Sequence, residues 1–142
     1  MKTLITIEIR ITDLNESYMI EADTVANKAT ITNKLTGNEF DYHILGNSNT
    51  ISKIVDKLGD VKVGSEIING EIASQIMHNG GLRAVVEAIG ESISRKSNPI
   101  ETAKDLYMEY NNEISNDIPM TDIIRIALSE RKDLDKWRIE VK

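Results

Sequence analysis

The chain has 142 residues, no cysteine, a formal net charge of −6 and an aromatic content of 4%. This length predicts one domain, and the lack of cysteine excludes disulfides, thiolate nucleophiles and cysteine-ligated metal sites. The acidic charge and the scarcity of aromatic rings disfavour nucleic acid as a partner, because phosphate contacts need clustered Lys and Arg and base stacking needs rings.

Alternating apolar residues predict strands in residues 1–46, the β-rich part of the domain. The first strand, over residues 3–12, has one apolar face made of Ile5, Ile7, Ile9 and Ile11. The alternation continues over residues 18–22. Residues 29–34 and 39–45 then predict a hairpin closed by the loop 35–38, in which Gly37 suits the left-handed conformation. We therefore expect an antiparallel β-meander of about four strands.

Helical spacing replaces the alternation in residues 47–135, where we expect four to five helices. The first runs from the predicted N-cap Thr50 to the predicted stop Gly59. Two later helices cover residues 82–96 and the stretch that opens at Asn98 and Pro99. Arg83 and Glu87 in the former are spaced for an ion pair. A last helix is predicted through Thr121, Ile124, Ala127 and Leu128.

Residues 61–79 support two interpretations. Ser65 could cap a helix that extends to residue 79, with isoleucines aligned along one face. The pair Asn69-Gly70 between apolar runs is also typical of a two-residue hairpin turn. We favour the helix, because Ala73-Ser74-Gln75 lacks residues that form strands readily.

Residues 136–142 predict a C-terminal strand, in which Trp137, Ile139 and Val141 form an apolar stripe. This strand either returns to the N-terminal sheet or pairs with another chain. An exposed strand edge can be covered by a second copy, which favours a homodimer or a higher homo-oligomer. The fold class is thus α+β, in a single domain spanning residues 1–142.

Two places could hold a small anion such as a phosphate-bearing nucleotide. Arg95 and Lys96 immediately precede the helix that Asn98 caps, and a helix N-terminus favours negative charge. The turn Gly80-Gly81, with Arg83 close by, offers backbone N–H groups in the same way. Ordinary helix termination also explains both places: Gly80 can end a helix with positive φ, and Asn98 can cap the next one.

Catalytic and metal-binding candidates are weak. His43 and His78 are the two histidines, and they fall in segments assigned to different layers of the fold. There is no glycine-flanked nucleophilic serine and no phosphate-loop motif. Tyr107 and Tyr110 lie three residues apart on one helix and could form an interface patch, although half-buried packing explains them equally well. We predict no catalytic residue, no metal and no cofactor.

The sequence favours a non-enzymatic binding protein over an enzyme. Small acidic chains without a reaction motif include inhibitors, immunity proteins and phage-encoded inhibitors of host defence, which occupy a protein partner that is often basic. The alternatives are a binder of a small anionic ligand and an oligomeric assembly subunit. No apolar run approaches the ~20 residues of a membrane span, and the alternating N-terminus does not resemble a signal peptide, so we expect a cytoplasmic protein.

Overall fold

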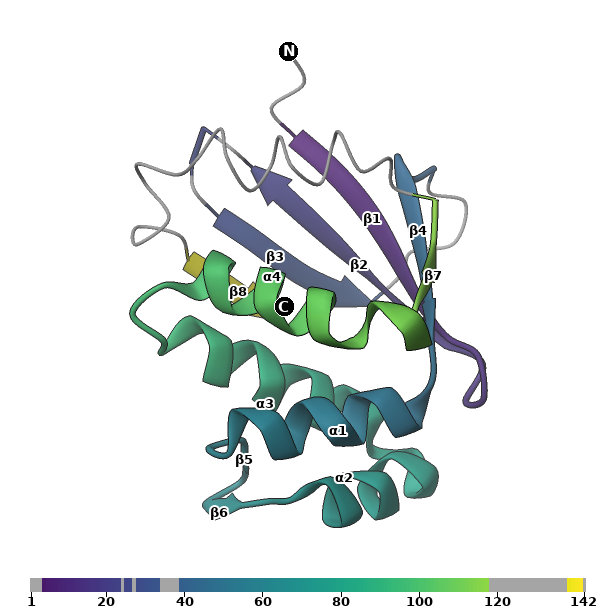
Figure 1. The fold of residues 1–142 in the computed structure, drawn as a ribbon, viewed down its shortest axis with the longest axis vertical. Helices are drawn as coiled ribbons and strands as arrows, with labels where there is room; N and C mark the ends of the chain where they lie inside the picture. The colour runs from purple at the N-terminus through teal and green to yellow at the C-terminus, as the bar shows by residue number, and fades with distance from the viewer. Residues whose placement is uncertain (1–3, 24, 27, 34–38, 118–137, 142) are drawn as a thin grey trace.

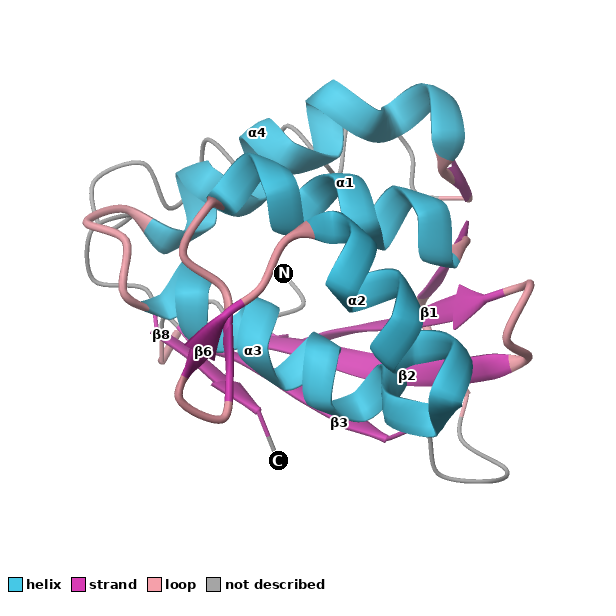
Figure 2. Cartoon of the chain, turned by 90° about the horizontal axis from the view of Figure 1, so that it is seen from below, coloured by secondary structure: helices cyan, strands magenta, loops and turns pink. Residues whose placement is uncertain are grey.

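The chain folds as an α+β domain in which helices cover one face of a mixed sheet (Figures 1 and 2). The structure, a computed structural model, describes residues 4–23, 25–26, 28–33, 39–117 and 138–141. Neighbouring strands in the sheet follow the order β7-β4-β1-β2-β3-β8. The strands of the sheet are β1 (Leu4–Ile11), β2 (Glu16–Asp23), β3 (Lys28–Asn33), β4 (Tyr42–Gly46), β7 (Ser115–Asn116) and β8 (Arg138–Val141).

The first three strands form the predicted antiparallel meander. Ile7 lies opposite Ile20 in the register of β1 and β2, and Ile20 lies opposite Ile31 in that of β2 and β3. Side chains alternate between the two faces of a strand, so this register places isoleucines from all three strands on the face toward the helices. The alternating pattern of the sequence is therefore confirmed for β1 to β3.

The predicted hairpin between residues 29–34 and 39–45 is wrong. Strand β4 does not pair with β3; it crosses to the other side of β1 and runs parallel to it, with Ile44 beside Ile9. The carboxylate of Asp41 helps to hold this crossing, because it accepts hydrogen bonds from the Thr6 backbone N–H at 2.9 Å and hydroxyl at 3.2 Å. The sheet is consequently mixed, whereas the sequence predicted an antiparallel one.

The C-terminal strand returns to the sheet. Strand β8 runs parallel to β3, with Ile139 in register with Ala29 and Val141 with Ile31. Of the two alternatives for this segment, pairing within the chain is the one observed, and Trp137 lies outside the described residues. The predicted homo-oligomer thereby loses the strand edge on which it was based and stays a prediction.

Three long helices have ends that the local sequence explains. They are α1 (Ser48–Leu58), α3 (Leu82–Ser94) and α4 (Pro99–Tyr110). Asn98 caps α4 as predicted, and Gly59 ends α1 with a φ of 76°. The predicted cap Thr50 is wrong, because Asn47 caps α1 by accepting a hydrogen bond from the Thr50 backbone N–H at 3.0 Å.

The ambiguous segment contains both a small hairpin and a helix. Strands β5 (Lys62–Val63) and β6 (Glu66–Ile67) pair around Gly64, whose φ is 66°. Helix α2 (Gly70–Ile76) follows, and it continues through the π-helical turn η1 (Met77–Gly81) into α3. The predicted start at Ser65 is wrong, because Asn69 caps α2 through the backbone N–H of Ile72 at 2.9 Å.

The described residues contain three long helices, fewer than the four to five expected, because the seven-residue α2 continues through η1 into α3. The 3₁₀ turn η2 (Asn111–Glu113) adds only three residues after α4. The predicted last helix, from Thr121 onward, lies outside the described residues. Among the helices that the structure describes, none combines the length and the apolar character needed to cross a membrane.

The main core lies between the sheet and helices α1 to α3. Its largest fully buried apolar side chains are Val55, Val61, Met77, Leu82 and Val85. Leu82 and Val85 belong to α3, a helix that the sequence predicted. Helix α4 packs over the same sheet face but buries less, with Leu106 as its buried apolar residue. The space under α4 is where the candidate site lies.

Candidate functional site

An apolar cavity with binding potential lies between the sheet and helices α1, α3 and α4. Its volume is about 350 Å³. The floor comes from β1 to β4, and the walls come from the three helices. Representative lining residues are Ile9, Ile20, Ile31, Ile54, Ile89 and Ile93. The isoleucine face of the sheet, predicted as a core face, therefore lines a cavity as well as a core.

The cavity has the volume and the lining of a small-molecule site. Binding sites for small molecules span about 300–1,000 Å³, and most of their lining is apolar. The volume of this cavity falls within that range. A molecule that binds the folded cavity and not the unfolded chain would stabilise the fold.

Four lining residues carry polar atoms: Tyr18, Asn47, Thr50 and Tyr107. Burial, and to a smaller extent the nearby charge of Glu16, raises the pKa of Tyr18 to about 12. Burial also raises the pKa of Tyr107, whose hydroxyl oxygen accepts a hydrogen bond from the amide of Asn116. Both phenols are therefore protonated at neutral pH and bring no negative charge to the cavity.

The cavity-lining Thr50 contacts a charged pair, and we define Thr50, Lys53 and Glu113 together as the rim. The Glu113 carboxylate lies 2.9 Å from Lys53 Nζ and 3.3 Å from Thr50 Oγ1. The hydroxyl of Tyr110 donates to the carbonyl oxygen of Lys53 at 3.4 Å. The rim joins α1 to the turn η2 that follows α4, and its one cation is already paired with a carboxylate.

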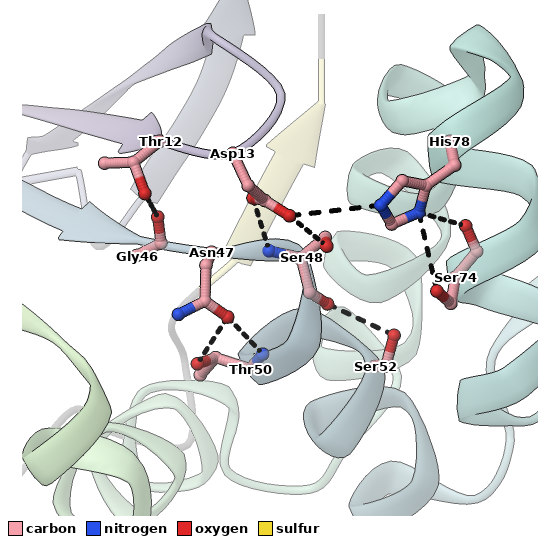
Figure 3. Close-up of polar contacts among 9 residues, drawn as sticks. All are labelled: Thr12, Asp13, Gly46, Asn47, Ser48, Thr50, Ser52, Ser74 and His78. Carbon is pink, nitrogen blue, oxygen red and sulfur yellow. Dashed lines mark hydrogen bonds and ion pairs between the residues drawn. The ribbon is translucent and has the colours of Figure 1, made fainter.

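The N-terminus of α1, beside this rim, is occupied by the protein's own side chains (Figure 3). Asp13, in the turn after β1, accepts hydrogen bonds from the backbone N–H of Ser48 at 2.9 Å and from its hydroxyl at 2.5 Å. Burial alone would raise the pKa of Asp13, but the bonds from Ser48 outweigh burial and lower it. Asp13 thus stays ionised and acts as an anion at the helix start.

This cluster caps the start of α1. Ser48 gives its hydroxyl hydrogen to Asp13, and His78 Nε2 lies 4.0 Å from the same carboxylate. The other ring nitrogen of His78 lies 2.8 Å from the carbonyl oxygen of Ser74, which it can contact only as a donor. Asp13 therefore lies between the serine and the histidine, in an order that differs from a serine hydrogen-bonded directly to a histidine base.

The structure brings Arg95 and Lys96 together, but both side chains contact a residue of the protein itself, Asp60. Arg95 Nη2 donates to the backbone oxygen of Asp60 at 3.1 Å, and Lys96 Nζ lies 3.0 Å from its carboxylate. The buried hydroxyl of Ser92 donates to the same carboxylate at 2.5 Å. Asn98 uses its side-chain oxygen to cap the backbone N–H of Glu101. An anion at this place would have to compete with Asp60, which local spacing could not reveal because it lies 35 residues before Arg95.

The other predicted residues serve mainly structural contacts. Gly80 has a φ of 86° where α2 gives way to α3, as the helix-termination alternative predicted. Arg83 pairs with Glu87 at 2.8 Å, which confirms the predicted ion pair. Tyr107 and Tyr110 are half-buried and point their hydroxyls at polar partners. Ile139 and Val141 lie in β8, within the sheet.

The two histidines have separate partners. His43 on β4 contacts the buried Glu8 of β1 at 3.0 Å, and His78 contacts Ser74 and Asp13. Across the part of the chain that the structure describes, no three histidine or acidic side chains gather closely enough to hold a metal ion.

The Asp60 cluster makes stability depend on pH. Hydrogen bonds from Ser92 and Lys96 lower the pKa of Asp60 below its ordinary value of 3.8. A lowered folded-state pKa contributes stability above the unfolded-state value, and this contribution is lost as the pH falls through the folded-state value. We expect the free energy of unfolding to fall less between about pH 6 and about pH 3 in Asp60→Asn than in the wild-type protein.

Urea unfolding at the two pH values measures this difference. Asp105→Asn is the matched control, because Asp105 is exposed on α4 and should retain the wild-type pH dependence. An identical pH dependence in Asp60→Asn and the wild type would contradict the stabilising role of the ionised carboxylate.

Comparison with known proteins identifies the fold. No protein-family model matches the sequence, and no curated protein matches it significantly. The transcriptional regulator yvhJ from Bacillus subtilis is similar with a TM-score of 0.63 and 11% identity, over 100% of this chain and 83% of that chain. Protein gbs0355 from Streptococcus agalactiae is similar with a TM-score of 0.62 and 13% identity, over 99% of this chain and 77% of that chain. B. subtilis TagU is similar with a TM-score of 0.51 and 13% identity, over 99% of this chain and 84% of that chain. At these identities the chain shares the fold of these bacterial proteins, and the likeness extends to nothing further.

Proposed function

We propose that this protein binds a molecule with a long hydrocarbon part in the cavity between the sheet and helices α1, α3 and α4. The observation that carries the proposal is the cavity itself, with about 350 Å³ of space and an almost wholly aliphatic lining. Burial of a hydrocarbon there would gain about 25 cal/mol per Å² of apolar surface removed from water.

The size of the cavity indicates the size of the ligand. A methylene group needs roughly the space of a liquid water molecule, about 30 Å³, so the cavity accommodates a chain of about twelve carbons. The three hydroxyl groups and one amide group in the lining would orient one end of the ligand.

The predictions of a protein partner, an inhibitor or an assembly subunit draw no support from the described contacts. A small-molecule site is favoured because the sheet face and three helices bound an almost wholly apolar cavity. The predicted binder of a small anionic ligand shares the small-molecule class but differs in chemistry, since its candidate cations Arg95 and Lys96 already contact Asp60.

Displacement of a fluorescent apolar probe tests the proposal. The uncharged probe N-phenyl-1-naphthylamine should bind saturably, with one probe per chain, and dodecanol should displace it. Dodecanol should also raise the thermal midpoint of unfolding, since ligand at about 100 times Kd stabilises by about 2.7 kcal/mol. Absence of saturable probe binding, together with an unchanged midpoint, would overturn the proposal.

A further inference from the structure

We infer that the polar end of the bound molecule is uncharged, a hydroxyl or a carbonyl group, and lies at the rim formed by Thr50, Lys53 and Glu113. The inference rests on the proposed hydrocarbon ligand and specifies the chemical class of its other end. Three features of the rim carry the inference: the pairing of its cation, the filling of the nearby helix N-terminus and the types of polar group left in the lining.

The cation at the rim is neutralised. Lys53 Nζ lies 2.9 Å from Glu113 Oε1, and the same oxygen lies 3.3 Å from the hydroxyl of the cavity-lining Thr50. Glu113 is the more buried partner, with 30% of its side chain exposed against 47% for Lys53. A carboxylate or phosphate beside Thr50 would therefore meet negative charge first, and it could recruit Lys53 only by breaking this pair.

The N-terminus of α1 offers little to an anion. A helix start binds phosphate through its free first-turn N–H groups. Here the Ser48 N–H donates to Asp13 at 2.9 Å, and the Thr50 N–H donates to the Asn47 side chain at 3.0 Å. The Ile51 N–H donates to the Asn47 backbone at 3.3 Å. The carboxylate of Asp13 already occupies the position that an anionic group of a ligand would take.

The polar groups that remain suit an uncharged partner. The Thr50 hydroxyl is directed to the oxygens of Asn47 and Glu113, so its own oxygen is left as an acceptor for a ligand O–H. The amide nitrogen of Asn47 points away from Thr50 in Figure 3, which leaves an N–H donor for a ligand oxygen. Among the described residues, the lining has no unpaired charge. Its one donor and one acceptor match a ligand hydroxyl, which can accept a hydrogen bond from Asn47 and donate one to Thr50.

A matched series of twelve-carbon compounds tests the inference. Dodecanol, dodecanoate, dodecyl phosphate and dodecylammonium compete for bound N-phenyl-1-naphthylamine at a pH where the acids and the amine are charged. We expect dodecanol to displace the probe at a concentration at least about tenfold lower than any charged member of the series. Equal or tighter binding of a charged member would overturn the inference while leaving hydrocarbon binding intact. Absence of probe binding would overturn the proposed function itself.

Glu113→Gln separates the effect of the rim on the ligand's polar end from the binding of its hydrocarbon part. Removal of the carboxylate frees Lys53, so dodecanoate and dodecyl phosphate should bind at least about tenfold more tightly, while the affinity for dodecanol stays within about twofold. Glu109→Gln is the control, because Glu109 pairs with Lys57 at 3.3 Å in a similar ion pair but is not part of the rim. Its ligand preference should equal that of the wild type. An unchanged preference in Glu113→Gln would contradict the charge argument.

Discussion

Replacement of Ile89 by Trp is expected to weaken binding of the apolar probe at least about tenfold, a loss of about 1.4 kcal/mol or more. Ile89 lies on α3 between Val86 and Ile93, and all three side chains line the cavity. An indole ring at this position would project into the middle of the space that a hydrocarbon chain needs. Because the cavity already provides room, the larger side chain should cause little of the strain that overpacking normally brings. Probe titration and urea unfolding of the same sample measure the two effects.

Ile72→Trp is the matched control for this experiment. Ile72 is also a helical isoleucine, but it is 41% exposed on α2 and does not line the cavity. Its substitution should leave probe binding at the wild-type level. Wild-type affinity in a folded Ile89→Trp protein would place the probe elsewhere and contradict the assignment of the cavity as the binding site.

The sequence predicts the elements whose evidence is local. Alternation along β1 to β3 and the caps at Gly59 and Asn98 depend on residues within a few positions of one another, and the structure confirms them. The position of β4 depends on the Asp41–Thr6 contact, which spans 35 residues. The short loop containing Gly37 predicted that β4 would pair with β3. In the structure β4 instead pairs with the distant strand β1.

The candidate site lies almost wholly beyond what local patterns can predict. Periodicity identifies Ile9 and Ile20 as residues of a buried face, but it does not say whether the facing helices fill the space above them. The low content of large aromatic side chains was visible in the composition, and it is the one sequence signal consistent with a cavity. The anion candidates Arg95 and Lys96 both contact Asp60, a partner that spacing within a single helix could not reveal.

Replacement of Gly70 by Ala is expected to lower the free energy of unfolding by about 3 kcal/mol. A Cβ atom at this position would lie 2.5 Å from the backbone oxygen of Ser52 and 2.5 Å from the carboxylate of Asp56. Asp56 could rotate away, but it would then lose the hydrogen bond that the Gly70 N–H donates to it at 2.7 Å. Ser52 O belongs to the backbone of α1, so relief there requires the two helices to separate.

Urea denaturation compares this variant with Gly46→Ala, whose added Cβ would meet nothing within 4 Å. The control should keep wild-type stability, since neither contact nor backbone conformation opposes the methyl group. Equal stability of the two variants would mean that α1 and α2 separate at little cost. The close approach also explains the glycine at this position without the hairpin turn at Asn69-Gly70, which was the less favoured alternative. Glycine is needed here for contact between two helices, a requirement set by Ser52 and Asp56 and not by a turn in the chain at Gly70 itself.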